Sequence, residues 1–537
     1  MDEAPVQSAR RLFPFHSGVL LYTTGVVILT AVSLSLLLLK LQLSEMLLHA
    51  GHALLAFAGV GLSQSSPSSQ GRYETVDLSW HPSKQTQLNN LTAVVDGDGV
   101  YGFIYNSSDT PDELYAVYNW CNMPHVRKKE YVKAPDEYEL IFVEVIHRHH
   151  KRTPYSSNAF PVEPYQWNCD DQGLYYHGEP FGRPQQATPA YWKGYTSEVN
   201  PFIPSGWIGS CQFPQITSDG LSDSWQHGAD LYSVYHGLLH FLPDRNDRSW
   251  RRKVAYRVTH NSITSQVAGM LVHGMWRTTE RVPLLIQADA IDSLEPKYPC
   301  PAARDLLSRL TSRDANPRWA AHLDAAAPLY AKLDAISGVP PSDAGFHASL
   351  DHYYDNLSAR QCHQKPLPCS SAGGCVTQDL ADAVYRLGHW EYDHMYRGSR
   401  EALAAAAASF GVWIAELVAH LRGAMAPEGS GNGGVIYFHN VAHDGSVSRL
   451  LAVLQLDEMV WPGMGSEVVF ELYKQRRKGG GYFVRVLWGG KVLASSNPSL
   501  GVMDMLPVER LLAYFDGLVG QGAKQVVGKC NGSVALL

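Results

Sequence analysis

The sequence lacks three features that would have assigned it to common classes of protein. Acidic residues outnumber basic ones, 51 to 44, so the net charge is −7 and no overall positive field favours nucleic acid as a partner. No C-x-x-C pair occurs and the cysteine spacing matches no zinc site. No internal repeat divides the chain either. Any binding of anions must therefore come from a local cluster of residues.

What remains is the composition of a globular chain. Hydrophobic residues make up 45% of the sequence and charged residues 18%, which is enough apolar material for a large core. The 13 Trp and 28 Tyr argue against disorder through most of the chain. A length of 537 residues indicates more than one domain, or one large domain with insertions.

The N-terminal region has a different character. Residues 18–39 carry no charge, and at about 1.5 Å per residue they are long enough to cross a bilayer. Arg10 and Arg11 precede this run, so we expect a cytosolic tail (1–17), a signal-anchor transmembrane helix (18–39) and a membrane-proximal segment with a Ser-rich linker (40–70). Residues 71–537 would then be lumenal or extracellular in the secretory pathway. The alternative is a long signal peptide, cleaved near Ala56 and Ala58, and a secreted protein.

Cysteines and sequons agree with a lumenal location of residues 71–537, which we call the body. The cysteine count of eight is even, which favours disulfides in an oxidising compartment, although the sequence leaves their pairing open. Candidate N-glycosylation sites with the N-x-S/T pattern follow the expected anchor, at Asn90, Asn106, Asn356 and Asn531. The alternative is a set of unpaired cytosolic thiols with sequons that arise by chance.

Strand and helix patterns alternate along the body. Residues 138–146 and 253–259 read as buried strands, and the second is followed by a helix over 262–275. Further segments with a clear pattern are a helix at 228–242, mainly helical stretches at 302–336 and 376–422, a strand at 434–438, a helix at 446–456, and a hairpin formed by 466–473 and 481–488.

This alternation predicts an α/β fold, with its core at about 71–275 and 430–537 and an inserted helical cap at about 285–425. Sites in such folds form beyond the carboxyl ends of strands, where the loops 147–154 and 439–445 are expected.

The loop 147–154 (HRHHKRTP) concentrates positive charge where a strand ends. Guanidinium groups bind phosphate oxygens with paired hydrogen bonds, and a neutral imidazole can attack phosphorus. Two alternatives stay open on these residues alone. The run can be solvated surface or a localisation signal, and His147, His149 and His150 can together bind a metal.

Residues 148–154 (RHHKRTP) resemble the R-H-G-x-R-x-P signature of the histidine acid phosphatases. Residues 442–445 (AHDG) resemble the H-D motif of that family, and 217–235, 462–473 and 482–487 resemble further family segments in the same order. The resemblance covers residues 138–495 and points to the acid phosphatase-like branch that includes 2-phosphoxylose phosphatase. It implies the phosphoglycerate mutase-like fold, with a central, mostly parallel sheet flanked by helices.

The resemblance also implies a mechanism for phosphomonoester hydrolysis at acidic pH, with a small-molecule phosphomonoester as substrate. His149 would attack phosphorus and form a phosphohistidine. Arg148, Arg152 and His443 would bind the phosphoryl oxygens, and Asp444 would act as the general acid on the leaving oxygen. No metal or other cofactor is required.

Two departures from the family pattern stand out. His150 occupies the position of the family's glycine, so a side chain there would narrow the pocket or add a donor. In the family's R-x-T-x-x-x-R-T segment, Ile263 replaces the second arginine. Arg257 would then be the further phosphate ligand, assisted by Asn261 or His260, or it is a structural residue at the end of a strand. The loss at Ile263 also keeps a second function open: a catalytically weak lumenal protein that binds phosphorylated glycans or lipids. The natural substrate and the oligomeric state are not readable from the sequence.

Overall fold

The computed structural model describes residues 75–102, 110–162, 208–427 and 431–535, with short stretches between 166 and 203. The expected tail (1–17), anchor (18–39) and linker (40–70) lie outside these residues. Within the described part of the chain, no single helix has both the length and the apolar character needed to cross a membrane. The bent pair Arg400–Ser409 and Gly411–Met425 meets those criteria jointly, by length and composition alone.

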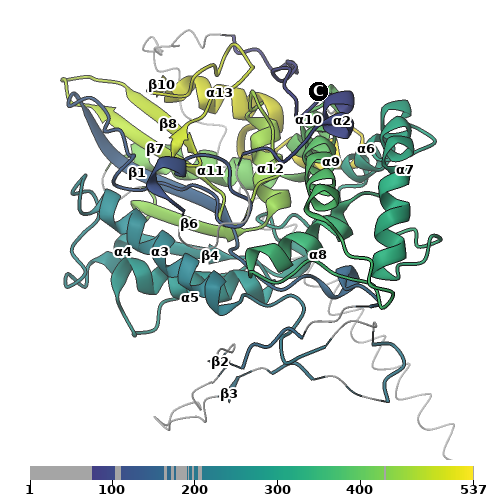
Figure 1. The fold of residues 1–537 in the computed structure, drawn as a ribbon. Coiled ribbons are helices and arrows are strands. Elements are labelled where there is room, and N and C mark those ends of the chain that lie inside the picture. Colours follow the sequence, from purple (N-terminus) through teal and green to yellow (C-terminus); the bar gives the residue numbers. More distant parts are fainter. Residues whose placement is uncertain are drawn as a thin grey trace, which may run out of the picture. The chain divides into compact units, whose positions relative to one another are not determined.

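An eight-stranded sheet forms the centre of the body, with the order β10-β8-β7-β1-β6-β4-β5 and β9 paired to β8 (Figure 1). Its strands are β1 (Tyr138–Arg148), β4 (Val254–Val258), β5 (Leu284–Leu285), β6 (Tyr437–Ala442), β7 (Glu467–Gln475), β8 (Tyr482–Trp488), β9 (Lys491–Val492) and β10 (Leu506–Pro507). A separate short pair consists of β2 (Tyr175–Tyr176) and β3 (Ala190–Tyr191).

The sheet is mixed rather than mostly parallel. β6 pairs in parallel with β1 and β4, and β4 with β5, whereas β7, β8 and β10 continue the sheet in antiparallel pairings. The prediction of a mostly parallel sheet is therefore corrected, because the 466–488 hairpin joins the sheet beside β1. β1 lies between a parallel and an antiparallel neighbour, which explains why its second half is buried throughout.

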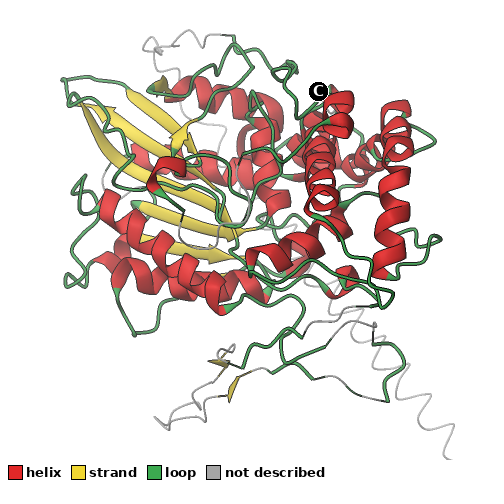
Figure 2. Cartoon of the chain, in the orientation of Figure 1, coloured by secondary structure: helices red, strands yellow, loops and turns green. Residues whose placement is uncertain are grey.

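Helices cover both faces of this sheet (Figures 1 and 2). The helices of the body are α3 (Ser218–Tyr235), α4 (Trp250–Lys253), α5 (Ser262–Trp276), α10 (Arg400–Ser409), α11 (Gly411–Met425), α12 (Asp444–Val453), α13 (Val508–Val519) and α14 (Val526–Asn531). α3 and α5 share one hydrophobic cluster with Val143 and Val145 of β1, whereas α10 to α13 share another with Phe142 and Ile146. Alternate residues of one strand thus enter two cores.

Glycines set the spacing between α3 and α5. A Cβ at Gly228 would lie 2.1 Å from the carbonyl oxygen of Leu271, and a Cβ at Gly274 would lie 2.0 Å from that of Trp225. The two helix backbones therefore touch, as only glycine permits. This contact fixes the place of His227, the neighbour of Gly228, against the end of β1.

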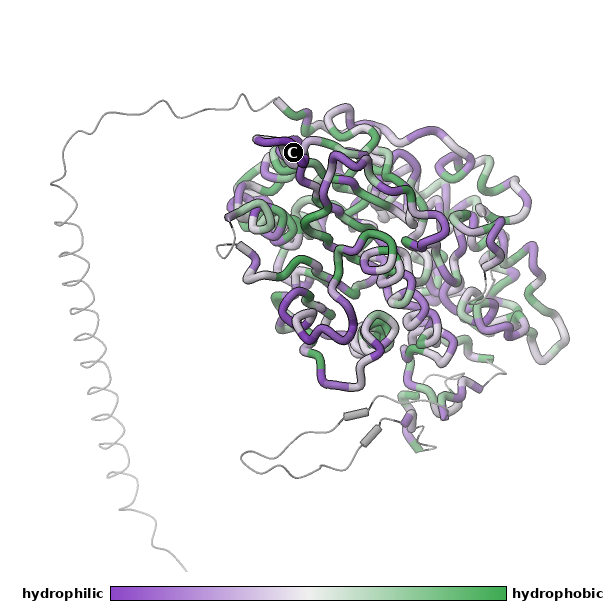
Figure 3. The backbone as a smooth tube through the Cα atoms, turned by 90° about the vertical axis from the view of Figure 1, so that its left-hand side faces the viewer, coloured by the Kyte–Doolittle hydropathy of each residue, from purple (hydrophilic) through white to green (hydrophobic). Residues whose placement is uncertain are grey.

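A second group of helices forms a cap with its own core. Its members are α2 (Leu91–Asp96), α7 (Pro317–Ser337), α8 (Asp351–Cys362) and α9 (Gln378–Tyr396), whereas α6 (Pro301–Leu310) packs in the cluster of the sheet. α7, α8 and α9 bury large aromatic side chains such as Trp319, Tyr354 and Trp390. Within the cap predicted over 285–425, α6, the Ala-rich helix α10 and its successor α11 contribute to the cluster of the sheet. Figure 3 shows apolar and polar residues alternating along the helices, as expected for helices with one buried face.

Most sequence-predicted elements occur where the patterns placed them, with two shifts. The strand expected at 434–438 is β6, which begins at Tyr437 because Gly433 and Gly434 adopt positive φ angles of 61° and 88° just before it. The helix expected at 228–242 is α3, which begins at Ser218 after its N-cap Thr217, whose side chain accepts a hydrogen bond from the Gly220 amide.

Disulfides use all the cysteines, which confirms the prediction of disulfide bonding. The pairs are Cys121–Cys362, Cys169–Cys211, Cys300–Cys530 and Cys369–Cys375. The first bond ties the segment before β1 to the end of α8, across 241 residues of sequence. Both of these cysteines lie in the hydrophobic cluster of the cap.

Candidate active site

A pocket of about 370 Å³ lies where β1 and β6 end. These strands are parallel neighbours with Arg148 opposite Ala442, so the two motifs meet at one edge of the sheet. The backbone completes the junction, because the His149 amide donates to Ala442 O at 3.0 Å and the Gly465 amide donates to His149 O at 3.0 Å. Of the residues proposed from the sequence, the pocket is lined by Arg148, His149, Arg152, His443 and Asp444.

His149 is oriented by a hydrogen bond within its own loop. Its Nδ1 lies 2.9 Å from His150 O, and because a carbonyl only accepts, this nitrogen carries the proton. The lone pair therefore sits on Nε2, the ring nitrogen available to an electrophile. Burial lowers the pKa of His149 well below its ordinary value, and the positive charges of Arg152 and Arg148 lower it further.

Arg148 and Asp444 form an ion pair at the wall of the pocket. Arg148 Nη2 lies 3.0 Å from Asp444 Oδ2, and Arg148 Nη1 donates to Pro462 O at 2.6 Å. Asp444 also accepts from the Trp461 indole at 3.0 Å and from the Gly445 amide at 2.8 Å. Burial raises the pKa of Asp444, but Arg148, the Trp461 hydrogen bond and Arg152 outweigh it and leave that pKa below its ordinary value.

A carboxylate from the cap holds Arg152. Asp355 Oδ1 lies 3.0 Å from Arg152 Nη1, and Asp355 Oδ2 accepts from the Tyr155 amide at 3.1 Å and from the Asn158 side chain at 2.8 Å. Arg152 also donates to Thr153 O at 2.9 Å. The guanidinium is thus fixed beside His149 before any ligand arrives. Asp355 belongs to no motif, and the sequence carried no signal for it.

His443 lines the pocket next to His149. Its ring lies edge-on to that of His149, with centroids 5.5 Å apart. Its Nε2 is 2.9 Å from the Thr259 hydroxyl and 3.4 Å from Glu295 Oε2. Lys297 and Arg449 add two further cations to the lining, and neither was recognised from the sequence.

Arg257 does not reach this pocket. It is held by Glu416 at 2.7 Å, Gln287 at 2.6 Å and Ser293 at 2.8 Å, with Asp292 at 3.3 Å. Because acidic and polar side chains already bind its guanidinium, Arg257 is not available to a phosphate. The prediction that Arg257 binds phosphate is therefore corrected in favour of the structural alternative. His260, named as an assistant, is exposed and also absent from the lining.

His150 is likewise outside the lining. Its ring packs under Gly465, where a Cβ would lie 2.5 Å from the ring, and it turns toward His227 of α3. The departure from glycine therefore neither narrows the pocket nor adds a donor to it. The three histidines that the sequence offered as a metal site do not face one common space. His149 faces the pocket, whereas His147 and His150 face α3. Lys151 forms a buried ion pair with Asp223 at 3.0 Å.

The candidate glycosylation sites differ in exposure. Asn90 and Asn531 are exposed, and Asn106 lies outside the described residues. Asn356 is 1% exposed, accepts from Arg360 Nε at 2.8 Å and donates to Asn158 O at 2.8 Å. A glycan on this amide is incompatible with these contacts, so the prediction at Asn356 is corrected for the folded chain.

Comparisons with known proteins give distant relatives. No protein-family model matches the chain. Counting factor 60 of Dictyostelium discoideum is 24% identical over 386 residues, which cover 68% of this chain and 85% of that protein. Human 2-phosphoxylose phosphatase 1 is 24% identical over 399 residues, with coverages of 71% and 76%.

Comparison with solved structures gives matches that include a Klebsiella phytase (16% identity, TM-score 0.47, coverages of 75% and 98%). The tartrate complex of a Hafnia alvei phytase is another (13% identity, TM-score 0.46, coverages of 71% and 98%).

Proposed function

We propose that this chain, a phosphomonoester hydrolase of the histidine phosphatase family, transfers the phosphoryl group of its substrate first to His149 and then to water. Its sequence relatives include proteins named as phosphatases, and both of its motifs follow the order of that family. The observation that carries the proposal is the meeting of two loops, about 300 residues apart in sequence, in one pocket through the pairing of β1 with β6.

The proposed first step is attack by His149 Nε2 on phosphorus. The hydrogen bond from Nδ1 to His150 O orients the ring and holds the proton away from the attacking nitrogen. Arg148, Arg152 and His443 surround the position of the phosphoryl oxygens and stabilise their charge in the transition state. The bond from phosphorus to the ester oxygen breaks as the bond to Nε2 forms.

Asp444 is proposed to protonate the departing oxygen. In the free protein, Arg148 keeps this carboxyl ionised, as its lowered pKa shows. A phosphate dianion bound to Arg148 and Arg152 adds negative charge beside Asp444 and so favours the protonated carboxyl. Water then attacks the phosphohistidine, with Asp444 as the base, and releases phosphate. We expect activity to be highest at acidic pH, where substrate binding and a protonated Asp444 coincide.

The charge balance of the pocket favours a substrate with a single phosphate. Beside its cations, the lining carries the acidic side chains of Glu295, Asp351 and Asp355 in addition to Asp444. A polyphosphorylated ring would bring several dianions against these carboxylates, whereas the hydroxyls of a sugar would donate hydrogen bonds to them. Relatives of this chain are named as phosphatases of 2-phosphoxylose, and a phosphosugar is the substrate class that we propose here.

The place of action is proposed to be the secretory pathway, with the body lumenal or extracellular behind a single N-terminal anchor. The disulfides support an oxidising compartment. Alkaline carbonate extraction tests the anchor, because an anchored chain stays in the membrane pellet. Recovery only as a soluble chain shortened by about 60 residues would instead indicate a cleaved signal peptide.

A second candidate function is binding of phosphorylated glycans or lipids with little turnover. The observation that favours it is the missing phosphate ligand, because Ile263 replaces an arginine of the family pattern and Arg257 is committed elsewhere. Binding without turnover would leave affinity for phosphate intact and hydrolysis absent.

Hydrolysis of p-nitrophenyl phosphate and a panel of phosphosugars across pH separates the two functions. His149→Asn should abolish turnover, whereas His240→Asn should match the wild type. His240 is exposed and adopts a φ of 52°, a conformation that asparagine tolerates. Equal rates for wild type and His149→Asn at every pH would refute the enzymatic proposal. Retained phosphate binding would then favour the second candidate.

A further inference from the structure

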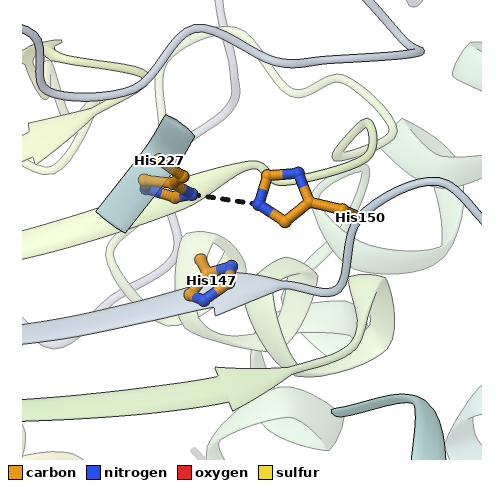
Figure 4. A group of neighbouring side chains, drawn as sticks. All are labelled: His147, His150 and His227. Carbon is orange, nitrogen blue, oxygen red and sulfur yellow. Dashed lines mark hydrogen bonds between the residues drawn. The ribbon is translucent and has the colours of Figure 1, made fainter. Parts of the chain in front are cut away.

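Three imidazoles lie close together beside the loop that carries His149, on the side of the sheet covered by α3. His147 is near the end of β1, His150 is in the loop that follows and His227 is on α3, and Figure 4 shows their rings around one small space. All three are fully buried. One ligand-type nitrogen from each lies within 4.8 Å of the others. The mechanism proposed above uses none of them.

Hydrogen bonds fix which nitrogens face this space. His147 Nδ1 donates to Arg148 O at 2.7 Å, so its lone pair is on Nε2, which has no hydrogen-bond partner among the described residues. His227 Nε2 lies 3.0 Å from Glu467 Oε2, and its Nδ1 faces His150. A carboxylate on the outer nitrogen of a histidine is the usual support for a metal ligand, because it fixes the tautomer and increases basicity.

The spacing fits two ligands of a tetrahedral ion. His150 Nε2 and His227 Nδ1 are 3.2 Å apart. Two nitrogens bound to zinc at about 2.0–2.1 Å, at a tetrahedral angle, lie about 3.4 Å from each other. A small rotation of the His147 ring would bring its Nε2, which has no partner among the described residues, to a similar distance. His439 lies edge-on to His147 with centroids 4.9 Å apart, and its Nε2 also has no partner among the described residues.

We propose that His147, His150 and His227 bind one divalent transition metal ion of the zinc class, with Glu467 supporting His227 from behind. Imidazole nitrogen is a preferred ligand for zinc, and three histidines leave the fourth position of a tetrahedral ion to another ligand. The ion would tie β1 and its loop to α3, and would thereby hold the segment that carries His149. This inference stands on the cluster itself and does not depend on phosphatase activity.

The competing arrangement is a neutral network, in which His150 Nε2–H donates to His227 Nδ1 and no ion is bound. The two arrangements differ in metal content, which is measured on full-length protein purified without a His tag from cells supplied with zinc. We expect about one equivalent of zinc per chain. His227→Gln should reduce this content more than about tenfold.

A matched control is available in His322→Gln. His322 is also fully buried, and its Nε2 lies 2.9 Å from Glu391 Oε1, but it belongs to the cap. This variant should retain the wild-type zinc content. An equal loss in both variants, or wild-type zinc content in His227→Gln, would overturn the site.

A second measurement avoids variants that fail to fold. Wild-type protein is treated with a chelator and then titrated with Co²⁺ while its visible spectrum and its thermal unfolding midpoint are recorded. The proposal expects a one-equivalent endpoint with the intense absorption of tetrahedral Co²⁺, and a rise in the midpoint because the ion binds only the folded chain. Folded wild-type protein that contains no stoichiometric metal and shows neither the absorption nor the rise would refute the site and leave the neutral network.

Discussion

Replacing Asp444 by asparagine should separate two tasks of the proposed active site: supplying a proton to the leaving group and binding phosphate. The change keeps the size of the side chain but leaves one acceptor oxygen, which can serve the Gly445 amide or the Trp461 indole. It removes the proton that the leaving group needs, and it removes the negative charge that pairs with Arg148 at 3.0 Å. Turnover and phosphate affinity should therefore move in opposite directions.

The expected size of each effect follows from these contacts. A positioned general acid contributes about 10²–10⁴-fold in rate, so turnover of a sugar phosphate should fall by about that factor. p-Nitrophenolate leaves without a proton, so turnover of its phosphate ester should fall less than about tenfold. Arg148 loses a charge-assisted hydrogen bond of about 1.5 kcal/mol, and inorganic phosphate should inhibit about tenfold more tightly.

The assay compares kcat for both substrates, together with the inhibition constant for phosphate, in wild type, Asp444→Asn and Asp314→Asn. Asp314 is exposed and lies in the cap, so its variant should behave as the wild type in all three measurements. An equal loss of kcat on both substrates, or unchanged hydrolysis of the sugar phosphate, would refute the role of Asp444 as general acid. Weaker inhibition by phosphate would refute the competition for Arg148.

Further predictions concern the surroundings of the site. Asp355→Asn should raise KM for phosphate esters about tenfold with a smaller effect on kcat, measured by steady-state kinetics, because Arg152 loses its ionic support; an unchanged KM would contradict this. Ile263→Arg should lower the thermal unfolding midpoint and restore no activity, since Ile263 is fully buried and a charge there has no partner; a gain in activity would contradict the fold. Asn356→Gln should leave the glycosidase-sensitive mobility shift on a gel unchanged, because that amide is buried; loss of part of the shift would show a glycan there.

Residues whose roles are set by local sequence could be predicted. The run 138–146 is apolar and β-branched, so the strand and the position of His149 after it follow from sequence pattern. The pairing of β1 with β6 was not predicted from the sequence, and it is this register that places His149 beside His443. Both motifs lie next to a strand end, which is why their neighbourhood could be anticipated.

Contacts between distant segments could not be predicted. Asp355 supports Arg152 from a helix of the cap, and no spacing in the sequence links these residues. The same holds for His227, which reaches His150 only because α3 and α5 approach through Gly228 and Gly274. The sequence could not decide between the two roles of Arg257, because its partner Glu416 lies on α11, far along the chain.

The bond between Cys121 and Cys362 makes the phosphate-binding geometry conditional on the cell's redox environment. It anchors the last residue of α8, the helix that also carries Asp355, to the polypeptide entering β1. A chain kept reduced would retain His149, Arg148 and Arg152. It would lack one covalent link that helps to position Asp355 behind Arg152. Full affinity for substrate would thus require an oxidising environment in which this bond forms.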